Sequence, residues 1–353
     1  DRGCVAANYV ALERASFADE TWTATVKNQV DGNTFDICAK VMINAAGAYV
    51  DPINAACGID TRHCHILSKG IHLIVPRISS EHRVLAFFAD DERLFFAIPM
   101  ANRTCIGTTD TQVDEPVTQV TAEDRQFVLD NINARLDLPN PLVRDDIIAE
   151  RCGVRPLAVS KQTDASTNVQ QLSRRHIVEV TWPQKQISIF GGKLTDCINV
   201  GDEICARVGA LGVQLGPRLQ WYGEPGPEER GAYLERARTL GIDGVVASDT
   251  GEALSERLWR RYGSRAMQML DAIEQDPSLT EPLIENSGIH RCEIEHLVQN
   301  EMIVKLEDYL RRRSKIELLV SRDTLRQSSG LLEACERLFG DQAQQKFNEY
   351  FDT

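Results

Sequence analysis

The sequence predicts a mixed α/β fold that is followed by an all-helical C-terminal domain. Short alternating apolar runs, separated by Gly, Pro, Asn and Asp, predict strands through much of residues 21–110. A further strand at residues 187–190 runs through two glycines into a predicted helix. Clusters of Gly and Pro at residues 216–217 and 223–227 then break the chain, and the apolar spacing beyond them is helical. We therefore expect a domain boundary at residue 216.

The first predicted element is a β-hairpin over residues 21–43. Apolar residues alternate along both arms, and the Asp-Gly-Asn sequence at residues 31–33 predicts the turn. The second arm ends in the small residues 44–47, where a cofactor could lie against bare backbone. A short helix is expected over residues 50–57.

The middle of the chain predicts an antiparallel sheet of the kind that suits a substrate-binding domain. Its strands are expected at residues 65–75, 84–88, 93–99 and 103–108, with a tight turn at residues 101–102. A helix over residues 123–136 is stopped by Pro139 and Pro141. Residues 147–154 then predict a strand that leads into a turn at residues 152–157.

Helices account for the remaining predictions. The helix after Lys193 carries an apolar stripe of Leu194, Ile198, Ile204, Val208 and Leu211. A second apolar face runs from Ile294 to Leu310 and ends in arginines at residues 311–313, whose charges complement the helix dipole. Contact of these arginines with anionic lipid is the alternative interpretation. Residues 324–351 predict one or two further helices.

The length, composition and net charge limit the classes of function that the chain can have. The 353 residues suggest two to three domains, and 42% hydrophobic residues suffice for their cores. A formal net charge of −13 argues against a nucleic-acid-binding protein, which needs a basic surface. An anionic substrate would need a local basic cluster, for which Arg155, Arg174 and Lys193 are the candidates.

Neither a disulfide framework nor a metal site is expected. The ten cysteines include no C-x-x-C pair, so we expect a reducing cytoplasm, with thiols such as Cys38 and Cys105 packed as small apolar groups. His63 and His65 share one face of a strand but lack a further ligand nearby in sequence. No run of about 18 apolar residues predicts a transmembrane helix, and no segment of this sequence predicts a signal peptide.

The segment Ile189-Phe190-Gly191-Gly192-Lys193-Leu194-Thr195 carries the most chemical information. Two glycines let a ligand approach the backbone, and the first-turn N–H groups of the following helix attract an anionic or electron-rich group. Lys193 adds a full positive charge there. The alternative is an ordinary strand-to-helix turn with a surface lysine.

Six ordered segments together resemble the FAD-dependent glycerol-3-phosphate dehydrogenases, within the D-amino-acid-oxidase-like flavoproteins. These segments are INAAGAYVD, LSKGIHLIVP, RLFFAIPMANRTCIGTTDT, GVRPL, SRRH and FGGKLT. The C-terminal part is also similar to the helical cap domain of that family, at RYGSRAMQML and EIEHLVQNEMIVKLEDYLRRRS. The resemblance covers nearly the whole chain.

The resemblance implies a domain layout. Residues 1–60 and 181–215 would belong to an FAD-binding Rossmann-like domain, residues 61–180 to an antiparallel substrate-binding domain, and residues 216–353 to the helical cap. The sequence begins at Asp1, and no G-x-G-x-x-G follows a strand in it, although that fingerprint normally holds the FAD pyrophosphate. We therefore expect a C-terminal portion of a longer flavoenzyme.

The resemblance also implies roles for single residues. Arg155 and Arg174 would bind the substrate phosphate, because a guanidinium grips phosphate oxygens in a bidentate way. His72 is the expected base and Lys193 its electrostatic partner, while a buried Lys193 with a lowered pKa is the rival base.

The FAD-binding residues implied by the resemblance are Ala46, Gly47, Gly191, Gly192, Leu194 and Thr195. The N–H groups of Leu194 and Thr195 would stabilise negative charge on the flavin as it accepts hydride. Many relatives follow GGKLT with Thr-Tyr-Arg, whereas residues 196–198 here are Asp-Cys-Ile, so any role of that arginine is in doubt.

The expected reaction is oxidation of sn-glycerol 3-phosphate to dihydroxyacetone phosphate, with quinone as electron acceptor and peripheral attachment to the cytoplasmic face of the membrane. A glycerophosphate oxidase that uses dioxygen is the close alternative. An oxidase of amino or hydroxy acids is disfavoured, because one arginine usually suffices for a carboxylate. A non-catalytic cap or docking module is the competing class.

Overall fold

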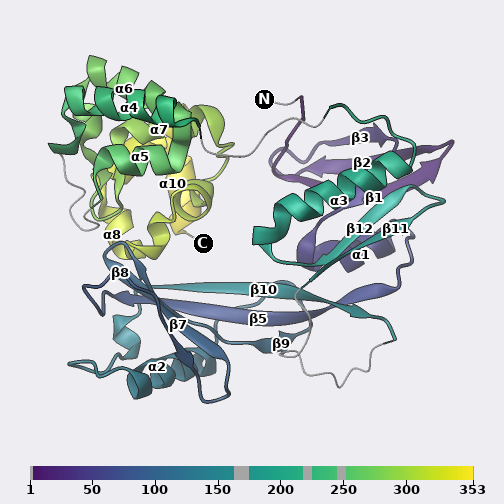
Figure 1. The fold of residues 1–353 in the computed structure, drawn as a ribbon, viewed down its shortest axis with the longest axis horizontal. Coiled ribbons are helices and arrows are strands. Elements are labelled where there is room, and N and C mark those ends of the chain that lie inside the picture. Colours follow the sequence, from purple (N-terminus) through teal and green to yellow (C-terminus); the bar gives the residue numbers. More distant parts are fainter. Residues whose placement is uncertain (1–2, 163–174, 218–224, 245–251, 353) are drawn as a thin grey trace. The chain divides into compact units, whose positions relative to one another are not determined.

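The chain forms two compact units in a computed structural model, which describes residues 3–162, 175–217, 225–244 and 252–352 (Figure 1). The first unit comprises Asp1–Ile71, Thr109–Val120 and Cys152–Leu219. The second comprises His72–Thr108, Thr121–Arg151 and Gln220–Thr353. The predicted class, an α/β region with antiparallel sheets and a helical C-terminal region, is confirmed.

Two three-stranded sheets lie in the first unit. One has the order β1 (Val10–Ala18), β2 (Thr21–Asn28), β3 (Thr34–Ala39), and all its neighbours are antiparallel. The other has the order β11 (His176–Thr181), β12 (Gln186–Gly191), β4 (Met42–Asn44), with β12 and β4 parallel. The hairpin turn predicted at residues 31–33 is confirmed, but β1 was not predicted.

The predicted second arm of that hairpin is wrong beyond Ala39. The chain leaves the first sheet there, and β4 enters the second sheet, where Ile43 lies opposite Ile187. The backbone N–H of Met42 donates to the carbonyl of Lys185 at 3.2 Å as this parallel pairing begins. An alternating apolar pattern is compatible with either sheet. It indicates on which face of its strand a residue lies, but not which strand pairs with it.

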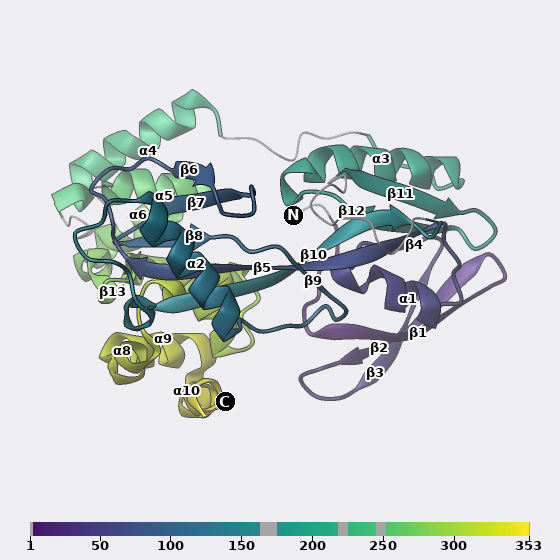
Figure 2. The same ribbon diagram turned by 90° about the horizontal axis from the view of Figure 1, so that it is seen from below.

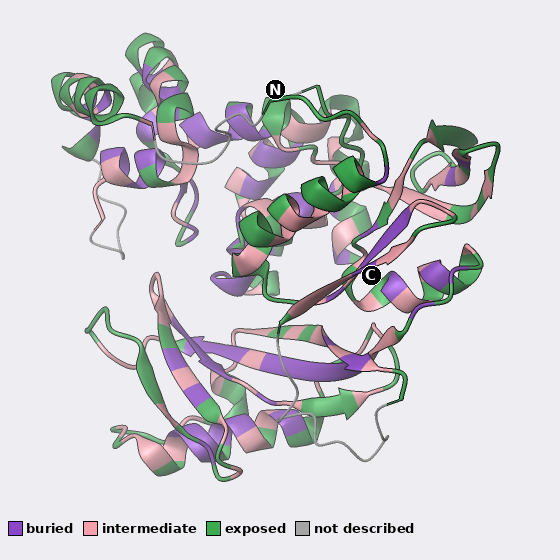
Figure 3. Ribbon diagram, turned by 45° about the vertical axis from the view of Figure 1, so that its right-hand side comes forward, coloured by how far each residue is buried: buried purple, intermediate pink, exposed green. Residues whose placement is uncertain are grey.

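Two helices cover the second sheet of this unit. Helix α1 (Val50–Ala56), which follows the 3₁₀ turn Gly47–Tyr49, lies on one face, and α3 (Cys197–Ala210) lies on the other (Figure 2). Val50 and the inward side chains of β12 are fully buried. No residue of α3 itself is buried, and of the predicted apolar stripe only Leu211, which directly follows the helix, is buried (Figure 3). The helix contacts β11, which is the edge strand, and this leaves much of its surface uncovered.

The longest strands are β5 (His63–Pro76) and β10 (Ala149–Ser160), and each contributes residues to both units. In the first unit, β9 (Thr111–Val113) pairs with Leu67–Lys69 of β5. In the second unit the antiparallel order continues from β5 through β8 (Arg103–Gly107) and β7 (Leu94–Met100) to β6 (Leu85–Phe88). Helix α2 (Ala122–Arg135), whose N-terminus carries a Thr121–Asp124 capping box, contacts β8.

The turn predicted at residues 152–157 is wrong, because β10 continues as a strand to Ser160. Pro156 lies inside this strand. Strand β10 is the edge of its sheet, and a proline on an edge strand need not interrupt the hydrogen-bonded ladder.

The C-terminal part of the second unit is helical, as predicted. Its helices are α4 (Pro227–Leu240), α5 (Leu254–Tyr262), α6 (Ala266–Gln275), α7 (Arg291–Asn300), α8 (Arg322–Gln327), α9 (Ser329–Phe339) and α10 (Ala343–Phe351). A small hairpin of β13 (Pro282–Ile284) and β14 (Ile289–His290), which was not predicted, lies between α6 and α7.

The single helix expected from Ile294 to the arginines is in fact interrupted. Helix α7 ends at Asn300, Met302 has φ +50°, and the chain resumes as the π-helix η8 (Asp308–Arg313). The Asp308 carboxylate accepts the backbone N–H groups of Val304 and Lys305 at 3.0 and 2.9 Å. This local hydrogen bonding ends the first helix and starts the second.

The remaining composition-based expectations have mixed outcomes. Within the described residues, no helix is long and apolar enough to cross a membrane, and no cluster of potential metal ligands occurs. All ten cysteines are free. Cys105 is buried as expected, but Cys38 is exposed, because it lies on the outer strand β3.

Candidate active site

Arg155 and Gly70 bring two of the motifs into contact. The Arg155 guanidinium, on β10, occupies the space where a Cβ would stand on Gly70 of β5. Its Nη1 donates to the carbonyl of Thr109 at 3.3 Å, and Nη1 lies 3.8 Å from a carboxylate oxygen of Asp110. The side chain is 31% exposed, so part of the guanidinium faces solvent. Gly70 therefore makes room for an arginine that a ligand can reach.

Further hydrogen bonds fix this arrangement. Ser68 donates its hydroxyl to Asp110, and the N–H of Ile71 donates to the Thr109 hydroxyl at 3.1 Å. Residues 68–71 of the LSKGIHLIVP segment and residues 109–110 thus hold Arg155 from two sides. The sequence indicated each segment separately but not that they meet.

Gly191 and Gly192 are required by the packing of the chain itself. Their φ angles are +62° and +90°, which disfavour any side chain. A Cβ on Gly192 would lie 2.9 Å from the Cβ of His176, and one on Gly191 would lie 3.1 Å from that of Ala158. The resulting turn presents backbone without side chains, as the sequence led us to expect.

His65 links this turn to the INAAGAYVD segment. Its Nε2 accepts the N–H of Gly191 at 3.0 Å, and its Nδ1 lies 2.8 Å from the carboxylate of Asp51. Nε2 is an acceptor here, so the ring proton is on Nδ1 and is donated to Asp51. The side chain is 1% exposed. The sequence predicted packing and no metal for this histidine, but not its role as a bridge between two motifs.

His176, from the SRRH segment, is held between two carboxylates. Nδ1 lies 2.7 Å from Asp196, and Nε2 lies 3.1 Å from Glu203. Hydrogen bonds from Asn199 and then from His176 lower the pKa of Asp196. Asp196 directly follows the GGKLT segment. Its contact with His176 anchors the start of α3. The spacing of a histidine and an aspartate across two segments is the only sequence signal that could have suggested this contact.

Lys193, Leu194 and Thr195 are exposed. Residues Leu194–Asp196 form a 3₁₀ turn, and α3 begins only at Cys197, so the helix starts later than predicted. No side chain caps the turn. Leu194 is 91% exposed. The buried environment that would make Lys193 a base is absent from the part of the unit that the structure describes.

The other predicted site residues lie apart from these or outside the described residues. Ala46 and Gly47, with φ +58° at Gly47, precede α1 in the first unit. His72 belongs to the second unit, where it pairs with Gly107 of β8. Arg174 lies outside the described residues. The structure thus joins Arg155 to Gly70 and Gly191 to His65, and it gives no distance between His72 and Lys193.

A cavity of about 760 Å³ lies next to the histidine bridge in the first unit. Asp51 and His65 line it, together with residues of α1 and β9. Among the described residues, none of the predicted phosphate-binding, catalytic or cofactor-binding residues lines this cavity.

Comparison with known families gives two matches. Residues 2–180 match the family described as FAD dependent oxidoreductase. Residues 230–346 match the family described as C-terminal domain of alpha-glycerophosphate oxidase. The two matches follow one another along the chain and correspond to the mixed region and the helical region.

Individual relatives agree with these matches. The chain is 29% identical to a glycerol-3-phosphate dehydrogenase of Pseudomonas tolaasii, over 83% of this chain and 57% of that protein. It is also 29% identical to glycerol-3-phosphate dehydrogenase 2 of Mycobacterium tuberculosis, over 89% of this chain and 54% of that protein. The chain therefore spans about half the length of these curated relatives.

One solved structure shares the fold. The glycerol-3-phosphate dehydrogenase from Bacillus halodurans, complexed with FAD, superposes with a TM-score of 0.75 at 24% identity. The match covers 99% of this chain and 69% of that one.

Proposed function

Because this chain belongs to the FAD-dependent oxidoreductase family, we propose that it carries the substrate site of an enzyme that oxidises sn-glycerol 3-phosphate to dihydroxyacetone phosphate. The relatives named glycerol-3-phosphate dehydrogenase support the choice of substrate. In this proposal Arg155 and Arg174 bind the phosphate.

The position of Arg155 over Gly70 is the observation that carries the proposal. The net charge of −13 repels a dianionic substrate, so its phosphate needs a fixed cation. A guanidinium offers a planar fork that matches two phosphate oxygens. Thr109 and Asp110 orient that fork, and the Arg155 side chain is 31% exposed, so a substrate can approach it.

The residues of the first unit fit an FAD cofactor. The turn of positive-φ glycines carries no side chains, and no side chain caps the N–H groups of the turn that follows. His65 already takes the N–H of Gly191, and in this proposal the N–H groups of Leu194 and Thr195 donate to the flavin. We assign cofactor contacts to Ala46, Gly47, Gly191, Gly192, Leu194 and Thr195. When bound, FAD would accept the hydride from the substrate carbon.

A base must take the proton of the substrate hydroxyl. We assign this role to His72, whose ordinary pKa lies near neutral pH. Lys193 then stabilises the negative oxygen of the substrate by its charge. In the alternative, Lys193 itself accepts the proton. A His72→Asn enzyme that keeps its rate of flavin reduction at high pH would favour that alternative.

The domain roles follow the same proposal. Residues 1–60 and 181–215 hold the cofactor, residues 61–180 bind the substrate, and residues 216–353 form a helical cap. The match of residues 230–346 to a C-terminal domain of alpha-glycerophosphate oxidase supports the last assignment.

The electron acceptor distinguishes two versions of this function. We favour a quinone, with peripheral attachment to the cytoplasmic face of the membrane, because the curated relatives are named dehydrogenases. Dioxygen is the second candidate, because the C-terminal family is described by an oxidase. A non-catalytic cap module is the third and has no support from these relatives.

Flavin absorbance tests the proposal. The protein as its gene encodes it, loaded with FAD, should lose its oxidised flavin absorbance when glycerol 3-phosphate is added without oxygen. Reoxidation by a quinone analogue or by dioxygen then identifies the acceptor. A protein that holds FAD but is bleached only by other substrates would contradict the substrate assignment. A protein that never holds FAD would support the non-catalytic module.

A further inference from the structure

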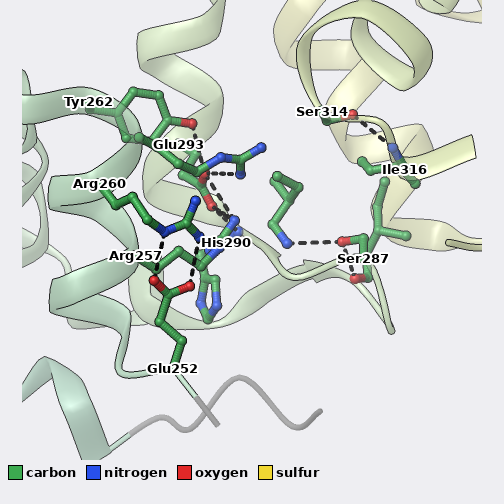
Figure 4. A network of polar contacts seen from close by, with 12 residues as sticks. Glu252, Arg257, Arg260, Tyr262, Ser287, His290, Glu293, Ser314 and Ile316 are labelled. Atoms are coloured by element: carbon green, nitrogen blue, oxygen red, sulfur yellow. Dashed lines mark hydrogen bonds and ion pairs between the residues drawn. The ribbon is translucent and has the colours of Figure 1, made fainter. Parts of the chain in front are cut away.

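A second cavity, of about 640 Å³, lies in the second unit and is lined by cationic side chains. Arg257, Arg260 and Arg261 of α5 form one wall, and Lys315 belongs to the loop before the 3₁₀ turn Ile316–Leu318. Glu252 is the one carboxylate among the described lining residues. Figure 4 shows the polar network at this cavity. Neither the predicted active-site residues nor the histidine bridge takes part in it.

The base of the cavity is a buried ion cluster. Glu293 is fully buried, and its two oxygens accept from Arg257 at 2.9 and 3.2 Å, Arg261 at 3.0 Å, and the Tyr262 hydroxyl at 2.7 Å. The backbone N–H of His290 adds a further bond at 2.8 Å. One carboxylate therefore faces two guanidinium groups, and its capacity to accept hydrogen bonds is filled.

Arg257 retains an unused donor. Its side chain is 7% exposed, and its Nη1 is buried with no hydrogen-bond partner among the described residues. A buried donor without a partner costs free energy, of roughly 1–3 kcal/mol, unless something accepts from it. Arg257 also lines the cavity, so a small movement of its guanidinium would bring this buried donor to a ligand there.

The cavity also has an excess of positive charge. Glu252 binds Arg260 through two bonds, of 2.8 and 2.7 Å, and Glu293 lies between Arg257 and Arg261. Among the described residues, four cations thus face two carboxylates, an excess of two positive charges in a chain whose net charge is −13.

Lys315 is an exposed lining residue of this cavity, with a φ of +62°.

We propose that this cavity binds a tetrahedral dianion, and specifically the phosphate group of a phosphorylated compound, between Arg257, Arg261 and Lys315. Guanidinium forks and an ammonium are the groups that recognise phosphate, and a dianion matches the excess of two positive charges. The phosphate belongs either to a soluble metabolite or to a lipid headgroup that ends in a phosphomonoester, because both present the same oxygens. This is an anion site additional to Arg155, carried by the helical region.

Hydrogen exchange with inorganic phosphate as the probe tests the site directly. Phosphate should slow exchange in α5 and around Lys315, and this local readout separates the cavity from any binding near Arg155. Removing Arg257 risks unfolding, because Glu293 would lose a buried partner, so the variant is Lys315→Gln at an exposed position. Lys346→Gln is the matched control, because Lys346 lines a different cavity of the same unit.

Lys315→Gln should weaken phosphate binding by about tenfold, and Lys346→Gln should leave it unchanged. No protection of α5, or equal losses in the two variants, would overturn the proposal. Vesicles of phosphatidylcholine with and without phosphatidic acid, whose headgroup is a phosphomonoester, then distinguish the sources. Protection of α5 by the anionic vesicles that Lys315→Gln abolishes identifies a lipid headgroup. Protection by inorganic phosphate alone identifies a soluble ligand.

Discussion

The guanidinium of Arg155 occupies the volume that a side chain on Gly70 would fill. The two residues come from strands β10 and β5, and their contact joins the GVRPL and LSKGIHLIVP segments. Gly70 has no positive φ, so its backbone conformation does not require glycine. A glycine is needed at residue 70 because the Arg155 guanidinium occupies the space of a side chain there.

A methyl group at residue 70 should displace Arg155 without unfolding the protein. The three atoms nearest to a Cβ at Gly70→Ala all belong to the guanidinium end of a flexible side chain, which can move away. We expect kcat/KM for glycerol 3-phosphate to fall by roughly tenfold or more, with little change in Tm. Gly153→Ala is the control, because nothing lies within 4 Å of a Cβ there and the residue is also in β10. Equal activity in the two variants would argue against the role of this contact.

Local signals in the sequence were sufficient for the turns and for most strands. The Asp-Gly-Asn turn and the tight turn at residues 101–102 are set by neighbouring residues, and both occur where predicted. The helical C-terminal region was also predicted, because its apolar period extends over many turns.

Relations between distant segments could not be predicted. Nothing local reveals that β4 pairs with β12, that Pro156 lies on an edge strand, or that Gly191 donates to His65. The break after α7 depends on Asp308, whose carboxylate competes for backbone N–H groups that a continuous helix would use. The composition of the motifs therefore indicated which segments contribute to the site. The contacts among these segments became known only from the fold.

The histidine bridge should contribute measurably to stability. His65→Leu removes the acceptor for the Gly191 N–H and the donor to Asp51, in a side chain that is 1% exposed. The free energy of unfolding in urea should fall by roughly 1–3 kcal/mol, because a buried N–H is left without a partner. His63→Leu provides the comparison. Its ring is 23% exposed, so we expect a smaller loss. A reversed order of the two losses would contradict this account.

Acid should destabilise the second unit through His290. Burial lowers the pKa of His290 below its usual value of 6.5, so the unfolded chain binds a proton at a higher pH than the folded one. Stability is therefore complete above pH 6.5 and is lost as the pH falls from there toward the folded pKa.

The test compares urea midpoints across that range for the unmodified protein and for His290→Gln, which can still donate to the Thr280 carbonyl. The variant should show a flatter dependence on pH. Part of the dependence of the urea midpoint on pH should persist, because burial also lowers the pKa of His296. His82→Gln, at an exposed histidine, should retain the full slope, and a variant of His290 that retained it too would refute the assignment.

Replacing two helical glycines by alanine should change the free energy of unfolding in opposite directions. A Cβ on Gly330 of α9 would overlap the backbone carbonyl of Leu283, which cannot move without shifting β13. Gly330→Ala should cost roughly 1–3 kcal/mol of unfolding free energy. Gly231, inside α4, has nothing within 4 Å of a Cβ, so Gly231→Ala should stabilise the protein by about 0.5–1 kcal/mol. Thermal unfolding of both variants would show whether the packing of α9 against β13 is as close as described.

The central claim is that Arg155 binds the substrate phosphate, and anaerobic titration of the FAD-loaded protein tests it most directly. Glycerol 3-phosphate should bleach the flavin of the unmodified protein. Arg155→Met should need about 10 to 100 times more substrate for half bleaching, because a charge-assisted hydrogen bond to phosphate is lost. Lys161→Gln removes one positive charge from the lysine that follows β10 and should need no more substrate than the unmodified protein. If Arg155→Met also titrates like the unmodified protein, the phosphate lies elsewhere and the central claim is wrong.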